Sequence, residues 1–127
     1  MPKTYYLDNA FVNAALRNTP FASPPTVYAA LFTVAPTAGG GGTEVAGGGY
    51  ARQAVMFTLP ANGVTSNAAD VIFPIAMAPW GTLVAFGLYD QSVGGNLLYF
   101  NMLSVPRSVA VNDQVRFPVG QLIASEA

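Results

Sequence analysis

The sequence predicts an all-β fold, mainly an antiparallel β-sandwich of the jelly-roll type, with one helix at the N-terminus. Apolar residues first recur every four positions, and after Pro20 the apolar pattern changes to period two. Turn signals made of Gly, Pro, Asn and Asp then separate short β-forming segments. A chain of 127 residues has the size of one domain. We therefore expect a helical arm over residues 1–19 and a single β-sandwich domain over residues 20–127.

The first expected element is a helix over residues 5–18. Leu7, Phe11 and Ala15 are spaced four apart, so they share one face of a helix. The Thr19-Pro20 pair is a stop signal. A helix this short needs packing against the rest of the protein or against another subunit. Leu7 and Phe11 are therefore candidate interface residues.

The β region is expected to begin with a strand over residues 26–34. Both faces of this strand are apolar, so both should be covered. Asn62-Gly63 and Gly94-Gly95-Asn96 supply turn residues, and Pro106 is expected at a sheet edge or a bend. Further short strands are expected at residues 52–59, 64–66, 70–73, 82–90, 97–105, 107–111, 114–117 and 120–124. The segment 107–111 should form a hairpin with 114–117.

Residues 35–49 contain two runs of glycine and are expected to form a long flexible loop. A phosphate-binding Walker loop requires a lysine after its last glycine, whereas Tyr50 follows Gly49 here. A dinucleotide fingerprint lies between a strand and a helix, and here both neighbouring segments are predicted strands. The pattern favours a mobile loop, with a contact arm that orders on assembly as the functional alternative. The role of residues 39–49 stays open at this point.

The composition favours a protein that contacts other subunits. Only 9% of the residues are charged, against about 25% in an average soluble domain. Part of the surface must then be apolar or small and uncharged, which is explained by coverage from neighbouring subunits or by a monomer rich in surface Gly, Thr and Asn. The basic residues are scattered, which disfavours nucleic-acid and membrane-surface binding. They are Lys3, Arg17, Arg52, Arg107 and Arg116.

The sequence offers few groups for catalysis. It contains no histidine and no cysteine, so no catalytic triad and no His- or Cys-ligated metal can form within the chain. We expect no enzyme activity, no cofactor and no metal. The carboxylates are interpreted as turn or solvated residues, namely Asp8, Glu44, Asp70, Asp90, Asp113 and Glu126.

Four aromatic residues could form a flat platform for sugars: Tyr50, Trp80, Tyr89 and Tyr99. The alternative, which the sequence favours, is that these rings pack in the core or at a subunit interface. A carbohydrate-binding module would expose Trp80 or Tyr50 in a shallow groove. Burial of both rings would argue against it.

An ordered series of motifs resembles a family of small virion proteins of tailed bacteriophages, labelled tail-fibre-like, head-fibre or decoration proteins. The motifs are VYAALFT at 27–33, PT at 36–37, GTEV at 42–45, GGGYARQAV at 47–55, ADV at 69–71, FP at 73–74, WGT at 80–82, GLYD at 87–90 and GGNLLY at 94–99. The resemblance extends from YYLDNAFVNAALR to FPVGQLIAS. It implies a β-sandwich-like, oligomeric virion component without catalytic activity, and it transfers no catalytic or binding residue. Residues 72–77 and 101–103 are more apolar than the family pattern, which would give a drier intersubunit contact.

The sequence and the resemblance together predict a non-enzymatic structural protein of a phage virion, assembled in the host cytoplasm. The favoured role is a capsid decoration or cement protein that stabilises the shell through oligomeric contacts. The alternatives are a tail or tail-fibre adaptor subunit and a carbohydrate-binding module. The expected partners are further copies of the chain, for example in a trimer, and the major capsid or tail proteins. The candidate interface residues are Leu7, Phe11, Tyr50, Arg52 and Trp80.

Overall fold

A computed structural model describes residues 2–126 and confirms an antiparallel β protein with one N-terminal helix. Met1 and Ala127, which the predicted domain bounds include, lie outside the described residues. The helix is α1 (Tyr5–Leu16). The strands are β1 (Val27–Val34), β2 (Thr43–Glu44), β3 (Gln53–Val55), β4 (Val64–Ser66), β5 (Val71–Ile72), β6 (Gly81–Tyr89), β7 (Leu97–Val109), β8 (Arg116–Phe117) and β9 (Ile123–Ser125).

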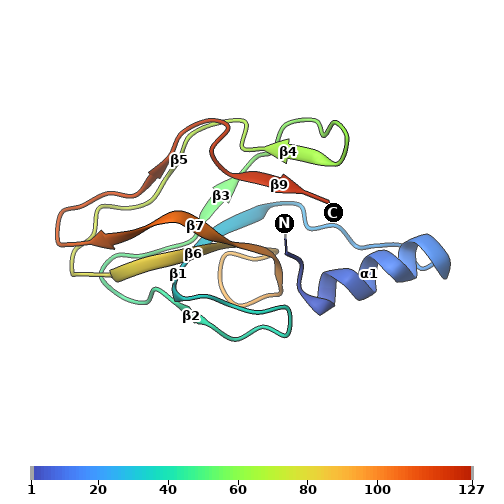
Figure 1. Cartoon of the computed structure of the whole chain (residues 1–127), viewed down its shortest axis with the longest axis horizontal. Coiled ribbons are helices and arrows are strands. Elements are labelled where there is room, and N and C mark those ends of the chain that lie inside the picture. Colours follow the sequence, from blue (N-terminus) through green and yellow to red (C-terminus); the bar gives the residue numbers. More distant parts are fainter. Residues whose placement is uncertain (1, 127) are drawn as a thin grey trace.

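The largest sheet has five strands. Its order is β2-β1-β6-β7, and β3 also pairs with β1. The strands β4 and β9 form one two-stranded ribbon, and β5 and β8 form another. Figure 1 shows both ribbons on one side of the large sheet, with α1 projecting from the end where the two chain termini lie. The strand β7 is therefore an edge strand, and the start of the chain lies beside it.

The large sheet is buried on both faces along β1. Ala29 and Leu31 belong to the main core between the large sheet and the two ribbons. Ala30 and Phe32 belong to a second apolar cluster on the opposite face. This alternation follows from the period of two along a strand. The prediction that both faces of this strand are covered is thus confirmed.

The predicted hairpin between residues 107–111 and 114–117 is wrong. β7 continues through Pro106 to Val109 and keeps its pairing with β6, while β8 pairs with β5. Leu83 opposes Arg107 but Ala85 opposes Met102, so residues 103–106 bulge out of the ladder. The bulge and the edge position of β7 accommodate Pro106, which has no N–H to donate. β3 also ends at Val55, well short of the predicted strand 52–59.

The glycine-rich segment is more regular than predicted. It contains β2, which pairs with β1, and the N–H of the buried Val45 donates to the carbonyl of Leu31. Further on, the indole N–H of Trp80 donates to the carbonyl of Gly48 over 2.9 Å. Position 42 requires glycine, because its φ of +76° lies in the left-handed region and a Cβ there would lie 2.7 Å from the Val34 carbonyl oxygen. The expectation of a loop without strand structure is therefore corrected. Its role in assembly stays a prediction.

Candidate functional site

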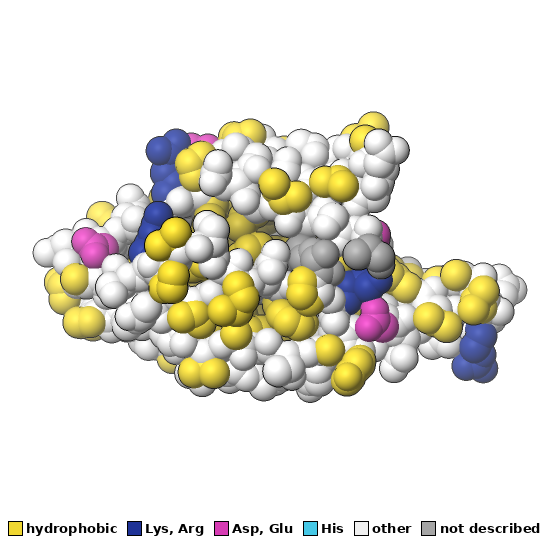
Figure 2. Space-filling view, viewed as in Figure 1, with side chains coloured by type: hydrophobic (Ala, Val, Ile, Leu, Met, Phe, Trp, Pro, Cys, Tyr) yellow, Lys and Arg dark blue, Asp and Glu magenta, His cyan; other side chains and the backbone are white. Residues whose placement is uncertain are grey.

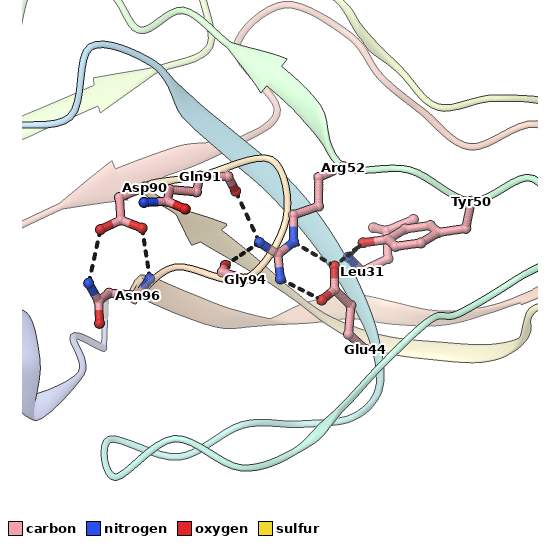
Figure 3. A network of polar contacts seen from close by, with 8 residues as sticks. All are labelled: Leu31, Glu44, Tyr50, Arg52, Asp90, Gln91, Gly94 and Asn96. Carbon is pink, nitrogen blue, oxygen red and sulfur yellow. Dashed lines mark hydrogen bonds and ion pairs between the residues drawn. The ribbon is translucent and has the colours of Figure 1, made fainter.

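An arginine lies at the centre of the polar network drawn in Figure 3. Arg52 immediately precedes β3, and Glu44 lies in β2. The guanidinium donates twice to this carboxylate, from Nη2 to Oε1 over 2.8 Å and from Nε to Oε2 over 2.9 Å. The Arg52 side chain is only 9% exposed and that of Glu44 is 22% exposed. The pair is thus a largely buried, bidentate ion pair, which is the strong form of this contact.

The same guanidinium also holds the loop between β6 and β7. Its Nη1 donates to the carbonyls of Gln91 over 3.0 Å and Gly94 over 2.7 Å. Its central carbon lies 3.6 Å from the centroid of the Tyr89 ring, in a cation–π contact. Arg52 therefore joins the loop after β6 to the glycine-rich segment. We call Glu44, Tyr50, Arg52 and Tyr89 the arginine clamp.

Tyr50 extends the arginine clamp into the core. Its hydroxyl donates to Glu44 over 2.6 Å and accepts from the N–H of Leu31 over 3.0 Å. Its ring packs against Phe73 and meets Trp80 edge-on. Burial, then the hydrogen bond to Glu44, raises the pKa of Tyr50 far above its ordinary value.

The charge states of Tyr50 and Arg52 are fixed around neutral pH. The hydrogen bond to Glu44 raises the pKa of Arg52, although burial acts in the opposite direction. With the phenol of Tyr50 neutral and Arg52 charged, the arrangement acts as a rigid link between loops. Neither Tyr50 nor Arg52 gains or loses a proton near pH 7.

A second cluster attaches the start of the chain to β7. We call the residues that receive it the arm dock, namely Leu97, Leu98, Tyr99, Phe100 and Glu126. Lys3 opposes Tyr99 in an isolated antiparallel bridge, and the N–H of Phe100 donates to the Pro2 carbonyl. Thr4 is the N-cap of α1, because its hydroxyl accepts from the N–H of Leu7. The same hydroxyl donates to a β7 carbonyl, that of Leu97, over 2.5 Å.

Charges complete the arm dock. The Lys3 ammonium lies 2.6 Å from Glu126, and the hydroxyl of Tyr99 donates to the same carboxylate. The hydrogen bond to Glu126 raises the pKa of Lys3. Burial acts to raise the pKa of Glu126, but the hydrogen bonds from Lys3 and Tyr99 hold it below its ordinary value. The two ends of the described chain are thus joined at one place.

The structure places the five predicted interface residues in two groups. Tyr50, Arg52 and Trp80 meet in and beside the arginine clamp, while Leu7 and Phe11 lie on α1. Leu7 is 1% exposed and Trp80 is 6% exposed, so within one chain both already belong to the interior. Their role in contacts between chains stays a prediction.

The interpretation of the carboxylates as turn or solvated residues is wrong for Glu44, which lies in β2 and is only 22% exposed. Asp70 and Glu126 are exposed but ion-paired. Glu44 pairs with Arg52, and Glu126 pairs with Lys3. Asp70 pairs with Arg116 in the same way. The partners lie 8, 123 and 46 residues apart, so no local spacing marks them. Asp90 and Asp113 do accept from backbone N–H groups in turns, as predicted.

A carbohydrate-binding module would expose the ring of Trp80 or Tyr50 in an open platform, and the structure does not show this for either residue. Trp80 is buried and its N–H is bonded to Gly48. Tyr50 is half-buried, and its ring packs against Phe73 and Trp80. Both rings therefore serve the core, which is the alternative that the sequence favoured.

Large apolar side chains are exposed on several parts of the surface. The most exposed are Leu16 on α1 and four residues in connections, namely Met56, Leu59, Met77 and Val93. Figure 2 shows yellow side chains gathered across the middle of one face, over β6 and β7. An apolar groove of about 440 Å³ lies beside Tyr99 and Glu126. No helix among residues 2–126 is both long enough and apolar enough to cross a membrane.

Among curated protein sequences, none matches this chain. A family model described as "Podophage GP4 fiber I protein gp80" matches residues 2–125. The match covers α1 and all nine strands of the described chain. The chain therefore belongs to this family of phage virion fibre proteins.

Proposed function

We propose that this protein is a non-catalytic structural subunit of a phage fibre, working as a homo-oligomer in contact with other virion proteins. The observation that carries the proposal is the family match over residues 2–125, because the family is described as a fibre protein. The fibre role replaces capsid decoration as the favoured one on this ground. Decoration of the capsid becomes the competing outcome of the experiment below.

The surface supports a subunit with several neighbours. The five most exposed apolar residues lie on α1, in the β3–β4 and β5–β6 connections and in the β6–β7 hairpin, so they face more than one direction. Charges that would keep copies apart are scarce, at 9% of all residues. Apolar surface of this kind is stabilised when neighbouring subunits cover it.

The interior supports a rigid unit. The arginine clamp joins the loop after β6 to the glycine-rich segment through four hydrogen bonds of one guanidinium. The arm dock joins the start of the chain to β7 and to Glu126. A subunit that transmits force along a fibre benefits from loops that are tied to the sheet in this way.

The experiment is a cryo-EM reconstruction of the purified particle that encodes this chain, with gold-labelled antibody against the purified protein as an independent marker. Particles assembled without the chain are the control. We expect the label and matching density on a fibre. Density on the capsid lattice would overturn the fibre role in favour of decoration, and absence from the particle would overturn a structural role in the virion altogether.

A further inference from the structure

Helix α1 is attached to the β-sandwich at its N-terminal end. The hydrogen bonds of the arm to the body come from Pro2, Lys3, Thr4 and Tyr5, and Leu7 is its buried apolar contact. Beyond this first turn, Val12 is 53% exposed and Leu16 is 80% exposed. Figure 1 shows the helix leaving the body and the chain returning beside it.

The returning segment, residues 17–26, has no regular structure in the described chain. Its hydrogen bonds go back to the helix: the N–H groups of Arg17 and Thr19 both donate to the carbonyl of Asn13. Phe21 packs edge-on against Phe11, which also belongs to the arm. Arg17, Thr19 and Phe21 of segment 17–26 thus attach the segment to the arm.

The reversal between the helix and this segment depends on one backbone position. Asn18 has φ of +53°, in the left-handed region that non-glycine residues adopt at a cost. Asparagine tolerates this conformation better than most residues and often ends a helix in it. If Asn18 took an extended conformation, the chain would not fold back, and residues 2–16 would point away from their own β7.

Three prolines, Pro20, Pro24 and Pro25, favour an extended conformation for the segment after this hinge. At roughly 3.1 Å per residue in a polyproline-like conformation, ten residues span about 30 Å, which is about the diameter of a small domain. The segment is therefore long enough to carry the arm to an adjacent copy. A hinge of this kind is the usual requirement for exchange of an identical element between copies.

We propose that residues 2–16 are exchanged between copies of this chain, so that the arm of one copy occupies the arm dock of its neighbour. The contacts of Lys3, Thr4 and Leu7 with β7 stay the same, because every copy presents the same dock. What changes is the surroundings of the exposed part of the arm, where Val12 and Leu16 then lie between two chains. This deepens the proposed function by giving the mode of self-association. Its test uses the purified chain, so it is independent of where the protein sits in the particle.

The decisive test is a disulfide between positions 3 and 99. These residues are directly opposed, and the flanking bonds from Phe100 to Pro2 and from Thr4 to Leu98 make them a non-hydrogen-bonded pair, which is close enough for a disulfide. The chain has no cysteine, so every disulfide comes from the introduced pair. The matched control is Thr82→Cys with Ser108→Cys, an opposed exposed pair inside the large sheet.

A Lys3→Cys chain is co-expressed with a Tyr99→Cys chain, and disulfide-linked peptides are identified by mass spectrometry. Arm exchange predicts a link between position 3 of one chain and position 99 of the other. The control substitutions, divided between two chains in the same way, should give no link. If the 3–99 link forms only within doubly substituted single chains, at the mass of one chain, the exchange is overturned.

The hinge supplies a second test that leaves the arm dock untouched. Asn18→Gly removes the cost of the left-handed conformation, whereas Asn18→Val increases it. Analytical ultracentrifugation should therefore show a shift of the monomer–oligomer equilibrium towards oligomer for Asn18→Val and towards monomer for Asn18→Gly. We expect a ratio of roughly five- to thirtyfold between the two constants. Equal constants for the two variants would contradict the proposal.

Discussion

The guanidinium of Arg52 lies over the ring of Tyr89, with its central carbon 3.6 Å from the ring centroid. All three of its nitrogens donate hydrogen bonds at the same time. One edge holds Glu44, and the remaining nitrogen holds two carbonyls of the loop after β6. A planar group with five donors can make all these contacts at once, whereas a lysine ammonium cannot. The position therefore requires arginine rather than a positive charge alone.

We predict that Arg52→Ala lowers the free energy of unfolding by about 3–5 kcal/mol, because it leaves the largely buried Glu44 without its charged partner and removes the donor of two loop carbonyls. Arg52→Lys should recover less than half of this loss. Urea denaturation followed by tryptophan fluorescence measures both, since Trp80 is the single tryptophan and packs against Tyr50.

The matched control is the ion pair of Arg116 with Asp70, in which the arginine side chain is 56% exposed. Exposed pairs contribute little, so Arg116→Ala should cost less than about 1 kcal/mol. If the two alanine variants are equally destabilised, the arginine clamp has no special role in stability.

A buried asparagine is predicted to be the most sensitive polar residue outside the arginine clamp. Asn67 is fully buried, and its Nδ2 donates to the carbonyls of Ala69 and Pro118 while its Oδ1 accepts from Leu122. It thereby joins the segment between β4 and β5 to the C-terminal part of the chain. Asn67→Ala should cost about 3 kcal/mol or more, because several buried backbone groups lose their partner together.

Asn67→Asp tests whether the donor matters. This substitution keeps the shape and the acceptor but replaces the amide donor with a carboxylate that faces two carbonyls. At pH 7 the urea midpoint of Asn67→Asp should be lower than that of the wild type. It should recover in part at lower pH, where the carboxyl is protonated and can donate again. A pH-independent midpoint for Asn67→Asp, with a cost below about 1 kcal/mol, would contradict this account.

The sequence predicted the elements of the fold better than their pairing. The Asn62-Gly63 turn has positive φ at both residues, as its composition indicated. The sequence does not predict the partner of β8, because residues 107–111 and β5 are both β-forming segments and only the packed core selects between them. Pro106 was expected at an edge or a bend, and it occupies a bulge on the edge strand β7.

The arginine clamp was only half visible in the sequence. Tyr50 and Arg52 are both among the interface residues that the sequence predicts. The sequence does not indicate that Glu44 and Tyr89 contact Arg52, since they come from other strands and meet it only after β1 has paired with β2 and β6. Contacts of this range depend on topology, and no spacing along the chain announces them.

Gly87 provides a test of the second apolar cluster. A Cβ added there would lie 2.7 Å from Cδ1 of Leu97 and 2.8 Å from Cε2 of Phe32, so these side chains must shift. We predict that Gly87→Ala lowers the free energy of unfolding by about 1–3 kcal/mol. Gly39→Ala is the control, since its nearest neighbours are 3.9 Å away and no strain is expected. Equal midpoints for the two variants in urea would show that the cluster is loosely packed.

Alkaline pH should destabilise the protein through Tyr50. Burial and the hydrogen bond to Glu44 raise its pKa in the folded state, so the stability that it contributes is complete below its ordinary pKa of 10.0 and is lost as the pH rises above that value. Tyr50→Phe should cost about 1–2 kcal/mol at pH 7, because the Leu31 N–H loses its acceptor.

Above pH 10, the two stability curves should converge by about 1.4 kcal/mol per pH unit, since only the wild-type chain must keep this phenol protonated to stay folded. Urea midpoints measured between pH 7 and pH 11 give both curves. Tyr5→Phe is the control, because that side chain is 63% exposed and its removal should leave the wild-type slope intact. Parallel curves for wild type and Tyr50→Phe would mean that the Tyr50 hydroxyl is as accessible to solvent in the folded chain as in the unfolded one, and the arginine clamp would then not extend into the core.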